Sequence, residues 1–355
     1  MRISDSAAND PSDAGVNPKP SPLEHPGISR RDFLKVTVAA AVATATGTLA
    51  LAADSKNEVP RRKLGRTGAE VSIVGLGGFH IGRPSESDGI RLVRTALDNG
   101  VNFLDNSWDY HAGDSEVRMG KALRDGYRDR AFLMTKIDGR TRQAAQKQID
   151  ESLRRLQTDH LDLLQIHEIG SPDDPDRVFG PGGAIEALVE SQKAGKTRFL
   201  GFTGHKSPDV HLKMLDAATA HNFRFDAVQM PLNVMDANFN SFEKKVVPVL
   251  VQQQTGVLGM KPLCFGAVLE SQTATAIECL HYAMNLPTST VITGCESMAI
   301  LQQALDAARS FRPLTPDQVS ALLAKTATVA RTGQYEPYKT SHRFDGTYWR
   351  PEWLG

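Results

Sequence analysis

Apolar and β-branched residues recur along the chain in eight short runs between residues 71 and 294. The runs are VSIVGLG (71–77), NFLDN (102–106), AFLMTKI (131–137), LDLLQIHE (161–168), TRFLGFTG (197–204), FDAVQMPLN (225–233), VLGMKPL (257–263) and STVITG (289–294). Runs of this length and composition are typical of buried β-strands. The pattern therefore predicts eight strands.

The segments between these runs have helical spacing. One example is a stripe of apolar residues at intervals of four, four and three, formed by Ala145, Ile149, Leu153 and Leu156. Alternating strands and helices imply a parallel sheet, and eight such units in roughly 250 residues match a closed (β/α)8 barrel. We therefore expect an α/β protein with a single TIM-barrel domain over residues 60–310.

An open doubly wound sheet is the alternative fold. Such a sheet normally carries a GxGxxG nucleotide-binding turn after its first strand. Here the corresponding segment is GLGGFHIG, in which His80 stands at the third glycine position. The broken motif favours the barrel.

Two further segments flank the predicted barrel. Residues 311–355 are expected to form a C-terminal helix, beginning with a capping box at TPDQ, and an aromatic tail that includes Trp349 and Trp353. We expect this tail to fold over the barrel mouth, with docking on the flank of the barrel as the alternative. Residues 1–28 have almost no bulky apolar side chains and are predicted to be disordered.

Residues 29–52 resemble a bacterial twin-arginine signal peptide. The segment SRRDFLK, with Arg30 and Arg31, precedes a weakly apolar stretch that ends in small residues. The resemblance implies that the twin-arginine export machinery carries the folded protein across the cytoplasmic membrane, into the periplasm or the cell exterior. We expect cleavage after Ala52 and no stable membrane insertion afterwards, and a retained anchor is the alternative.

The composition restricts the kinds of function that are possible. The chain has 41 basic and 41 acidic residues, so no global field draws it toward nucleic acid. Cys264, Cys279 and Cys295 are odd in number and lie in apolar runs, which predicts buried free thiols rather than disulfides. Function must therefore come from a local site.

Reacting groups in a barrel of this kind lie at the C-terminal ends of the strands. The residues at those ends are Gly77, His80, Asp105, Tyr110, Lys136, His167, Glu168, Thr203, His205, Gln229, Asn233, Met260, Lys261, Gly294 and Glu296. Lys136 lies in an otherwise apolar run and needs a counter-charge, which Asp105 can supply. A cation beside Tyr110 should lower the pKa of its phenol toward the range of a general acid.

The order and spacing of Asp105, Tyr110, Lys136 and His167 resemble the catalytic residues of the aldo-keto reductase family. The segments RKLGRTGAEVSIVGLG (62–77) and LRRLQTDHLDLLQIH (153–167) add to this likeness. The resemblance implies a (β/α)8 barrel that binds NADPH or NADH in extended form, and a short hairpin that closes its bottom. It also implies reduction of an aldehyde or ketone by hydride transfer. Tyr110 would donate the proton, Lys136 and Asp105 would tune Tyr110, and His167 would orient the carbonyl.

The resemblance also implies a set of cofactor contacts, namely Thr203, Gln229, Met260, Lys261, Gly294 and Glu296. Gln229 would bind the nicotinamide carboxamide, and Thr203 keeps one hydroxyl where the family usually has Ser-Asn. Met260 would cover the nicotinamide where the family commonly has an aromatic ring. Glu296 stands where an arginine often binds the 2′-phosphate, which favours NADH, whereas Lys261 could supply a compensating charge. The choice between NADPH and NADH stays open.

The catalytic turn departs from the family pattern. Most members have Tyr-Gly-x-Ser-Glu at this point, whereas this chain has YHAGDSE, which lengthens the turn by one residue and inserts His111. Trp108 either walls the substrate pocket or packs under the tail. Asp109, Asp114 and Glu116 are expected to be turn and helix-start residues.

Two other functional classes are weighed against the reductase. A metal-dependent barrel hydrolase could use the histidines His80, His111, His167 and His205, but the chain lacks the His-x-His pair and the late-strand aspartate of such sites. A non-catalytic nicotinamide-binding regulatory subunit is the other alternative. The intact catalytic set argues against it.

Overall fold

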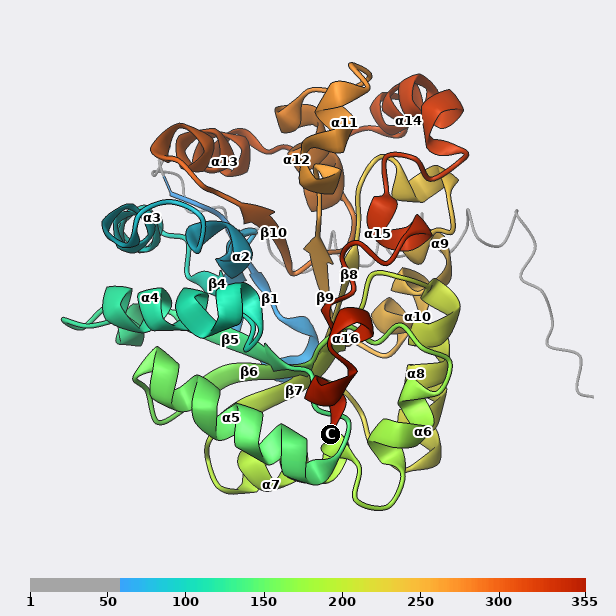
Figure 1. The fold of residues 1–355 in the computed structure, drawn as a ribbon. Coiled ribbons are helices and arrows are strands. Elements are labelled where there is room, and N and C mark those ends of the chain that lie inside the picture. Colours follow the sequence, from blue (N-terminus) through green and yellow to red (C-terminus); the bar gives the residue numbers. More distant parts are fainter. Residues whose placement is uncertain (1–57) are drawn as a thin grey trace, which may run out of the picture. The chain divides into compact units, whose positions relative to one another are not determined.

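Eight parallel strands close into a barrel in the computed structural model, which describes residues 58–355 (Figure 1). The strands are β3 (Val74–Gly77), β4 (Phe103–Asp105), β5 (Phe132–Ile137), β6 (Leu161–Ile166), β7 (Thr197–Thr203), β8 (Ala227–Pro231), β9 (Gly256–Met260) and β10 (Thr290–Gly294). Each strand pairs with the next in chain order, and β10 returns to pair with β3. The predicted fold is confirmed, while the expectations for residues 1–57 lie outside the described residues.

Helices follow the strands and surround the barrel (Figure 1). The longer ones are α3 (Glu86–Asp98), α4 (Asp114–Ala122), α5 (Arg142–Leu156), α7 (Ala184–Lys193), α8 (Pro208–Ala220), α12 (Ala276–Asn285) and α13 (Met298–Ser310). The shorter ones are α2 (Gly78–Ile81), α6 (Asp174–Phe179), α9 (Phe242–Lys245), α10 (Val247–Gln252) and α11 (Ala267–Glu270). All four residues of the predicted apolar stripe on α5 are buried.

Aromatic side chains fill the lower part of the barrel. The rings of Phe103 and Phe132 stack with their centroids 5.2 Å apart, and Phe199 stacks on Phe132 at 6.3 Å. The antiparallel hairpin of β1 (Arg61–Lys63) and β2 (Glu70–Ser72) adds the fully buried Leu64 to this cluster. The expected hairpin is therefore present, and its apolar turn packs into the base of the barrel.

The chain after the barrel forms one long helix and a tail. Helix α14 (Pro316–Ala330) begins with the predicted capping box between Thr315 and Gln318. The tail contains α15 (Pro337–Thr340) and α16 (Gly346–Trp349), and Figure 1 shows it in red, crossing the barrel. Its first part is fixed by Lys339, which pairs with Asp236 at 2.6 Å and with Glu336 at 2.9 Å, all three buried.

Two further observations concern the cysteines and the hydropathy of the helices. The three cysteines are free and buried, as predicted. Within residues 58–355, no helix combines the length and the apolar character needed to cross a membrane.

The hairpin turn offers a matched pair of glycine substitutions. Gly65 and Gly68 both have positive φ, +49° and +76°. A Cβ on Gly65 would lie 2.4 Å from the backbone nitrogen of Gly256, whereas a Cβ on Gly68 would meet nothing within 4 Å. Gly68→Ala should therefore lower the free energy of unfolding by about 1–2 kcal/mol, the cost of the backbone conformation alone. Gly65→Ala should lower it further. Urea unfolding of both variants measures this, and equal losses would contradict the close packing of the turn against β9.

Candidate functional site

Lys136 and Asp105 meet inside the mouth of the barrel, at the C-terminal ends of β5 and β4. Their side chains are 1% and 3% exposed and form a salt bridge. Lys136 Nζ also donates a hydrogen bond to the carbonyl oxygen of Asn106 at 2.7 Å. The second carboxylate oxygen of Asp105 accepts one from Gln229 Nε2 at 2.7 Å. The buried ammonium is therefore neutralised and held in one position.

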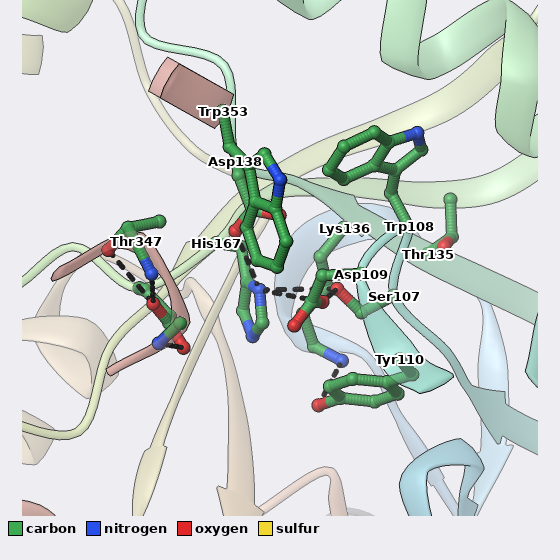
Figure 2. Close-up of polar contacts among 12 residues, drawn as sticks. Ser107, Trp108, Asp109, Tyr110, Thr135, Lys136, Asp138, His167, Thr347 and Trp353 are labelled. Carbon is green, nitrogen blue, oxygen red and sulfur yellow. Dashed lines mark hydrogen bonds and ion pairs between the residues drawn. The ribbon is translucent and has the colours of Figure 1, made fainter. Parts of the chain in front are cut away.

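Tyr110 lies in the turn after β4 and points toward Lys136 (Figure 2). Lys136 Nζ donates a hydrogen bond to the phenol oxygen at 3.2 Å and lies 4.7 Å from the centroid of the ring. Because an ammonium can only donate, the phenol keeps its own hydrogen for another acceptor. This geometry suits a proton donor.

The expected lowering of the Tyr110 pKa was wrong. Burial raises the pKa of Tyr110 well above its ordinary value, and the carboxylates of Asp105 and Asp109 raise it further. The sequence argument considered the nearby cation but not the loss of water and the surrounding negative charge. The phenol is thus held in its protonated form, which is the form a proton donor needs.

His167, which follows β6, meets a cluster of oxygen atoms through one ring nitrogen (Figure 2). Its Nδ1 lies 3.0 Å from Asp138 Oδ1, 3.3 Å from Asp109 Oδ1 and 3.2 Å from Ser107 Oγ. Ser107 Oγ in turn donates a hydrogen bond to Asp109 Oδ1 at 2.5 Å. Nε2 of His167 has no hydrogen-bond partner among the described residues. Asp109, expected to be a turn residue, is thus part of the site.

The two carboxylates decide the charge of His167. Burial lowers the pKa of His167, but Asp109 and Asp138 outweigh burial and raise it to about 10. Burial and the neighbouring Asp109 raise the pKa of Asp138 to about 6, while His167 lowers the pKa of Asp109 against the effect of burial. The raised pKa of His167 and the lowered pKa of Asp109 place the proton on His167, and the pKa of Asp138, although raised, stays below neutral pH.

Arg140, which sequence reasoning missed, joins the loops after β5 and β6. Its guanidinium is 1% exposed and pairs with Asp174 at 2.7 Å. It donates hydrogen bonds to the carbonyl oxygens of Asp138 at 2.7 Å, His167 at 2.9 Å and Glu168 at 3.1 Å. Nothing in its sequence position distinguished it from a surface arginine, because these partners come together only in the fold.

Glu168 fastens the tail to the barrel mouth. It has a left-handed backbone with φ of +49°, and its carboxylate accepts hydrogen bonds from Gly346 N at 2.9 Å, Thr347 N at 2.8 Å and Thr347 Oγ1 at 2.9 Å. Asp345 adds ion pairs with His205 at 2.9 Å and Lys206 at 2.7 Å. The tail therefore lies beside the loops that follow β6 and β7.

The two tail tryptophans have different surroundings. Trp353 meets Trp108 edge to face, with centroids 5.5 Å apart, so Trp108 packs under the tail. The backbone beside Trp353 is held by Gln148 Nε2 at 2.9 Å and, one residue later, by Arg140 N at 2.8 Å. Trp349 is 64% exposed. Of the two rings, Trp353 is the one placed at the mouth.

The turn after Tyr110 has two more residues than Tyr-Gly-x-Ser-Glu, His111 and Ala112, rather than the one expected, and the backbone accommodates both. His111 and Ala112 both have positive φ, +52° and +55°. The His111 ring turns away toward α2, where Nε2 lies 2.8 Å from the carbonyl oxygen of Phe79 and the ring occupies the space beside Gly82. The insertion therefore supports the wall of the site next to Tyr110.

Several buried polar atoms at the mouth have no hydrogen-bond partner within residues 58–355. Thr203 and Gln229 are paired across β7 and β8, and both are 1% exposed. Thr203 Oγ1, Gln229 Oε1 and both amide atoms of Gln165 have no hydrogen-bond partner within residues 58–355. A hydroxyl donor and an amide acceptor fit a carboxamide, so the residues present suit the cofactor. Gln165 was missed, although a polar residue inside the apolar run LLQI was a usable indication.

The remaining predicted cofactor positions lie around the ends of β9 and β10. Met260 ends β9 and is half-buried. Nζ of Lys261 lies 4.3 Å from the ring centroid of Phe265 and 5.8 Å from that of Phe344, and burial lowers the Lys261 pKa to about 8.

At the end of β10, a side chain on Gly294 would collide with the ring of His80, only 2.1 Å from the Cβ position. Glu296 is 42% exposed and pairs with Arg83 at 2.9 Å. These contacts connect the loop after β10 to the segment that follows β3.

The four histidines of the metal-hydrolase alternative do not share a centre. His205 binds Asp345, His111 binds a backbone carbonyl and His80 packs on Gly294. Within the described part of the chain, the single group compact enough to consider for a metal is Asp109, His167 and Glu168, whose candidate atoms lie within 4.8 Å of one another. These carboxylates already bind protein donors, and we assign no metal to them.

Known proteins are similar to this chain in sequence and in fold. The model of the aldo/keto reductase family matches residues 73–278, and that of twin-arginine translocation signal sequences matches residues 27–47. L-galactose dehydrogenase from Arabidopsis thaliana is 32% identical over 227 residues, which cover 60% of this chain and 68% of that protein. Aldo-keto reductase YhdN from Bacillus subtilis is 30% identical over 227 residues, covering 58% of this chain and 63% of that protein.

A solved structure supports the same fold. The aldo-keto reductase AKR11C1 from Bacillus halodurans, in its holo form, superposes with a TM-score of 0.65 at 22% identity and covers 76% of this chain and 96% of that chain. The family match and the barrel fold agree with each other. The chain therefore belongs to the aldo/keto reductase family, whose members are NAD(P)H-dependent oxidoreductases, and it carries a twin-arginine signal sequence at residues 27–47.

Proposed function

We propose that this protein reduces an aldehyde or ketone to an alcohol, with Tyr110 as the proton donor and Asp105, Lys136 and His167 as its catalytic partners. The observation that carries the proposal is the position of the Tyr110 phenol. It receives a hydrogen bond from Lys136 at 3.2 Å, and its ring centroid lies 5.7 Å from that of His167. A carbonyl oxygen placed between the two rings would meet a donor on each side.

The reaction follows from these positions. A bound nicotinamide supplies the hydride that the carbonyl carbon receives. As negative charge develops on the oxygen, Tyr110 transfers its phenolic proton to it, and the product is the neutral alcohol. The Lys136 ammonium, held by Asp105, stabilises the phenolate that Tyr110 becomes. His167 fixes the direction of the carbonyl oxygen.

The cofactor would be held by the chain's own unpartnered groups. Thr203 Oγ1 would donate to the carboxamide oxygen, and Gln229 Oε1 would accept from the carboxamide nitrogen. Met260 would cover one face of the nicotinamide ring. We assign the rest of the dinucleotide to the segment that includes Lys261, Gly294 and Glu296.

We assign the substrate pocket to the same mouth, with residues 311–355 as its cover. Trp353 packs on Trp108, and Thr347 is held by Glu168 next to His167. This tail would thus exclude water from the reacting carbonyl and select substrates by shape.

Replacing Tyr110 by Phe tests the reaction directly. The variant keeps the ring but loses the phenolic proton, so kcat with a panel of aldehydes and ketones should fall by about 10²–10⁴-fold. Nicotinamide oxidation, followed by absorbance, measures the rate, and fluorescence titration should show that cofactor affinity is unchanged. Tyr127→Phe, on the outer surface, is the matched control and should behave like the parent. Turnover by Tyr110→Phe at the parental rate would show that another group donates the proton.

Glu296→Gln tests the choice between NADPH and NADH. A carboxylate beside the adenosine ribose repels a 2′-phosphate, and its removal also frees the Arg83 cation. The variant should bind NADPH about three- to tenfold more tightly, with NADH affinity nearly unchanged. Glu86→Gln, which removes an exposed carboxylate paired with Lys121, is the control. An equal change for both dinucleotides would place Glu296 away from the ribose.

We also propose that the protein is exported folded, with its cofactor already bound. The twin-arginine signal supports this order, because that pathway accepts folded proteins. Protein purified from the exported fraction should contain close to one nicotinamide dinucleotide per chain, as measured by mass spectrometry after denaturation. A non-exported protein lacking residues 1–52 is the control. Exported protein that is free of nucleotide and binds it only weakly would contradict the proposal.

A further inference from the structure

His167 contacts two carboxylates, whereas orienting a carbonyl would require only one hydrogen-bond partner for the ring. Asp138 Oδ1 and Asp109 Oδ1 lie 3.0 Å and 3.3 Å from the same ring nitrogen, Nδ1 (Figure 2). The two carboxylates come from different loops, after β5 and after β4. Neither position belongs to the four residues that carried the family resemblance.

The hydrogen bonds around Nδ1 determine the protonation of the ring. Two of its neighbours are carboxylate oxygens, and Ser107 Oγ already donates its hydrogen to Asp109. All three atoms can therefore only accept, so Nδ1 must carry a hydrogen. In a neutral imidazole, Nε2 would then be an acceptor and could not donate to a carbonyl oxygen. A donor at Nε2 requires the imidazolium form.

We propose that Asp109 and Asp138 are positioning residues that hold His167 as an imidazolium cation, so that its Nε2–H is a charged hydrogen-bond donor to the substrate oxygen. This inference rests on the proposed function and deepens it. Hydrogen bonds from a charged donor are roughly twice as strong as those from a neutral one. The charge therefore acts where the alkoxide develops.

Other charged groups near His167 have partners of their own. Lys136 pairs with Asp105, Arg140 pairs with Asp174, and Glu168 accepts hydrogen bonds from the tail. The Lys136 ammonium also lowers the pKa of Asp109, but less than His167 does. Asp138 Oδ2 has no hydrogen-bond partner in residues 58–355. The neighbouring Tyr110 is held neutral by burial, which raises its pKa.

Because both partners are buried, the carboxylates need a cation and the imidazolium needs a negative charge. Asp138 is fully buried and His167 is 7% exposed. A buried carboxylate without a cation is strongly unfavourable, and His167 is the cation in contact with both Asp109 and Asp138. The raised pKa of His167, about 10, agrees with this geometry.

The protonation state can be read without any reaction. Nuclear magnetic resonance of protein labelled with ¹⁵N in the histidine rings distinguishes the imidazolium from both neutral tautomers, and His167→Gln assigns the signals of His167. In the cofactor-bound protein, His167 should remain doubly protonated up to about pH 9. In Asp109→Asn or Asp138→Asn it should lose a proton below about pH 8, because each amide keeps an accepting oxygen but removes the charge.

The rate should follow the same titration. A group with a raised pKa is protonated at low pH, so its contribution is lost as pH rises through that pKa. The parent enzyme should keep a level kcat between pH 6 and about pH 9, whereas each asparagine variant should approach the parental rate near pH 6 and be about tenfold slower at pH 8. Asp114→Asn, an exposed carboxylate at the start of α4, is the control and should follow the parent. A loss of rate that is independent of pH would indicate a purely structural role and overturn the inference.

The spectroscopic result separates this inference from the proposed function. If His167 titrates near its ordinary value in the parent protein, the inference fails even if the enzyme is an active reductase. If His167 stays protonated but no carbonyl is reduced, the proposed function fails and the carboxylates still set the charge of His167. Circular dichroism confirms folding of each variant, and because Asp109 and Asp138 lie on separate loops, one variant tests the charge if the other does not fold.

Discussion

The salt bridge between Lys136 and Asp105 is the interaction on which the rest of the site depends. An ammonium at 1% exposure is tolerable only if a carboxylate and further acceptors meet it. Adjacent strands β4 and β5 bring those groups together, and Gln229 on β8 reaches Asp105 from another part of the barrel. The closed sheet therefore determines the position of the Lys136 ammonium that contacts Tyr110.

Buried charges across the mouth are paired, although not always one to one. Arg140 has Asp174, and Lys339 in the tail has Asp236 and Glu336. His167 also faces two carboxylates through a single nitrogen. The pairs of Arg140 and Lys339 hold loops and tail in place, whereas the two carboxylates at His167 set the protonation of a ring next to Tyr110.

The sequence predicted the features that depend on local pattern. Strand and helix periodicity led to the barrel, and the rule that reacting groups follow the strands led to Asp105, Lys136 and His167. It did not predict Asp109 and Asp138 as partners of His167, because contacts between loops depend on three-dimensional closure. It also misjudged the Tyr110 pKa, because burial and several carboxylates act there together.

The tail has a consequence for the order in which the site is assembled. Glu168 binds residues 346 and 347, which are synthesised after every strand of the barrel. A chain that has completed β10 can close its sheet and form the Lys136–Asp105 pair, yet its mouth still lacks the segment that packs on Trp108. The barrel strands and the tail at the mouth are therefore separate segments of the chain, and the mouth takes its full form only after the last residues have been added.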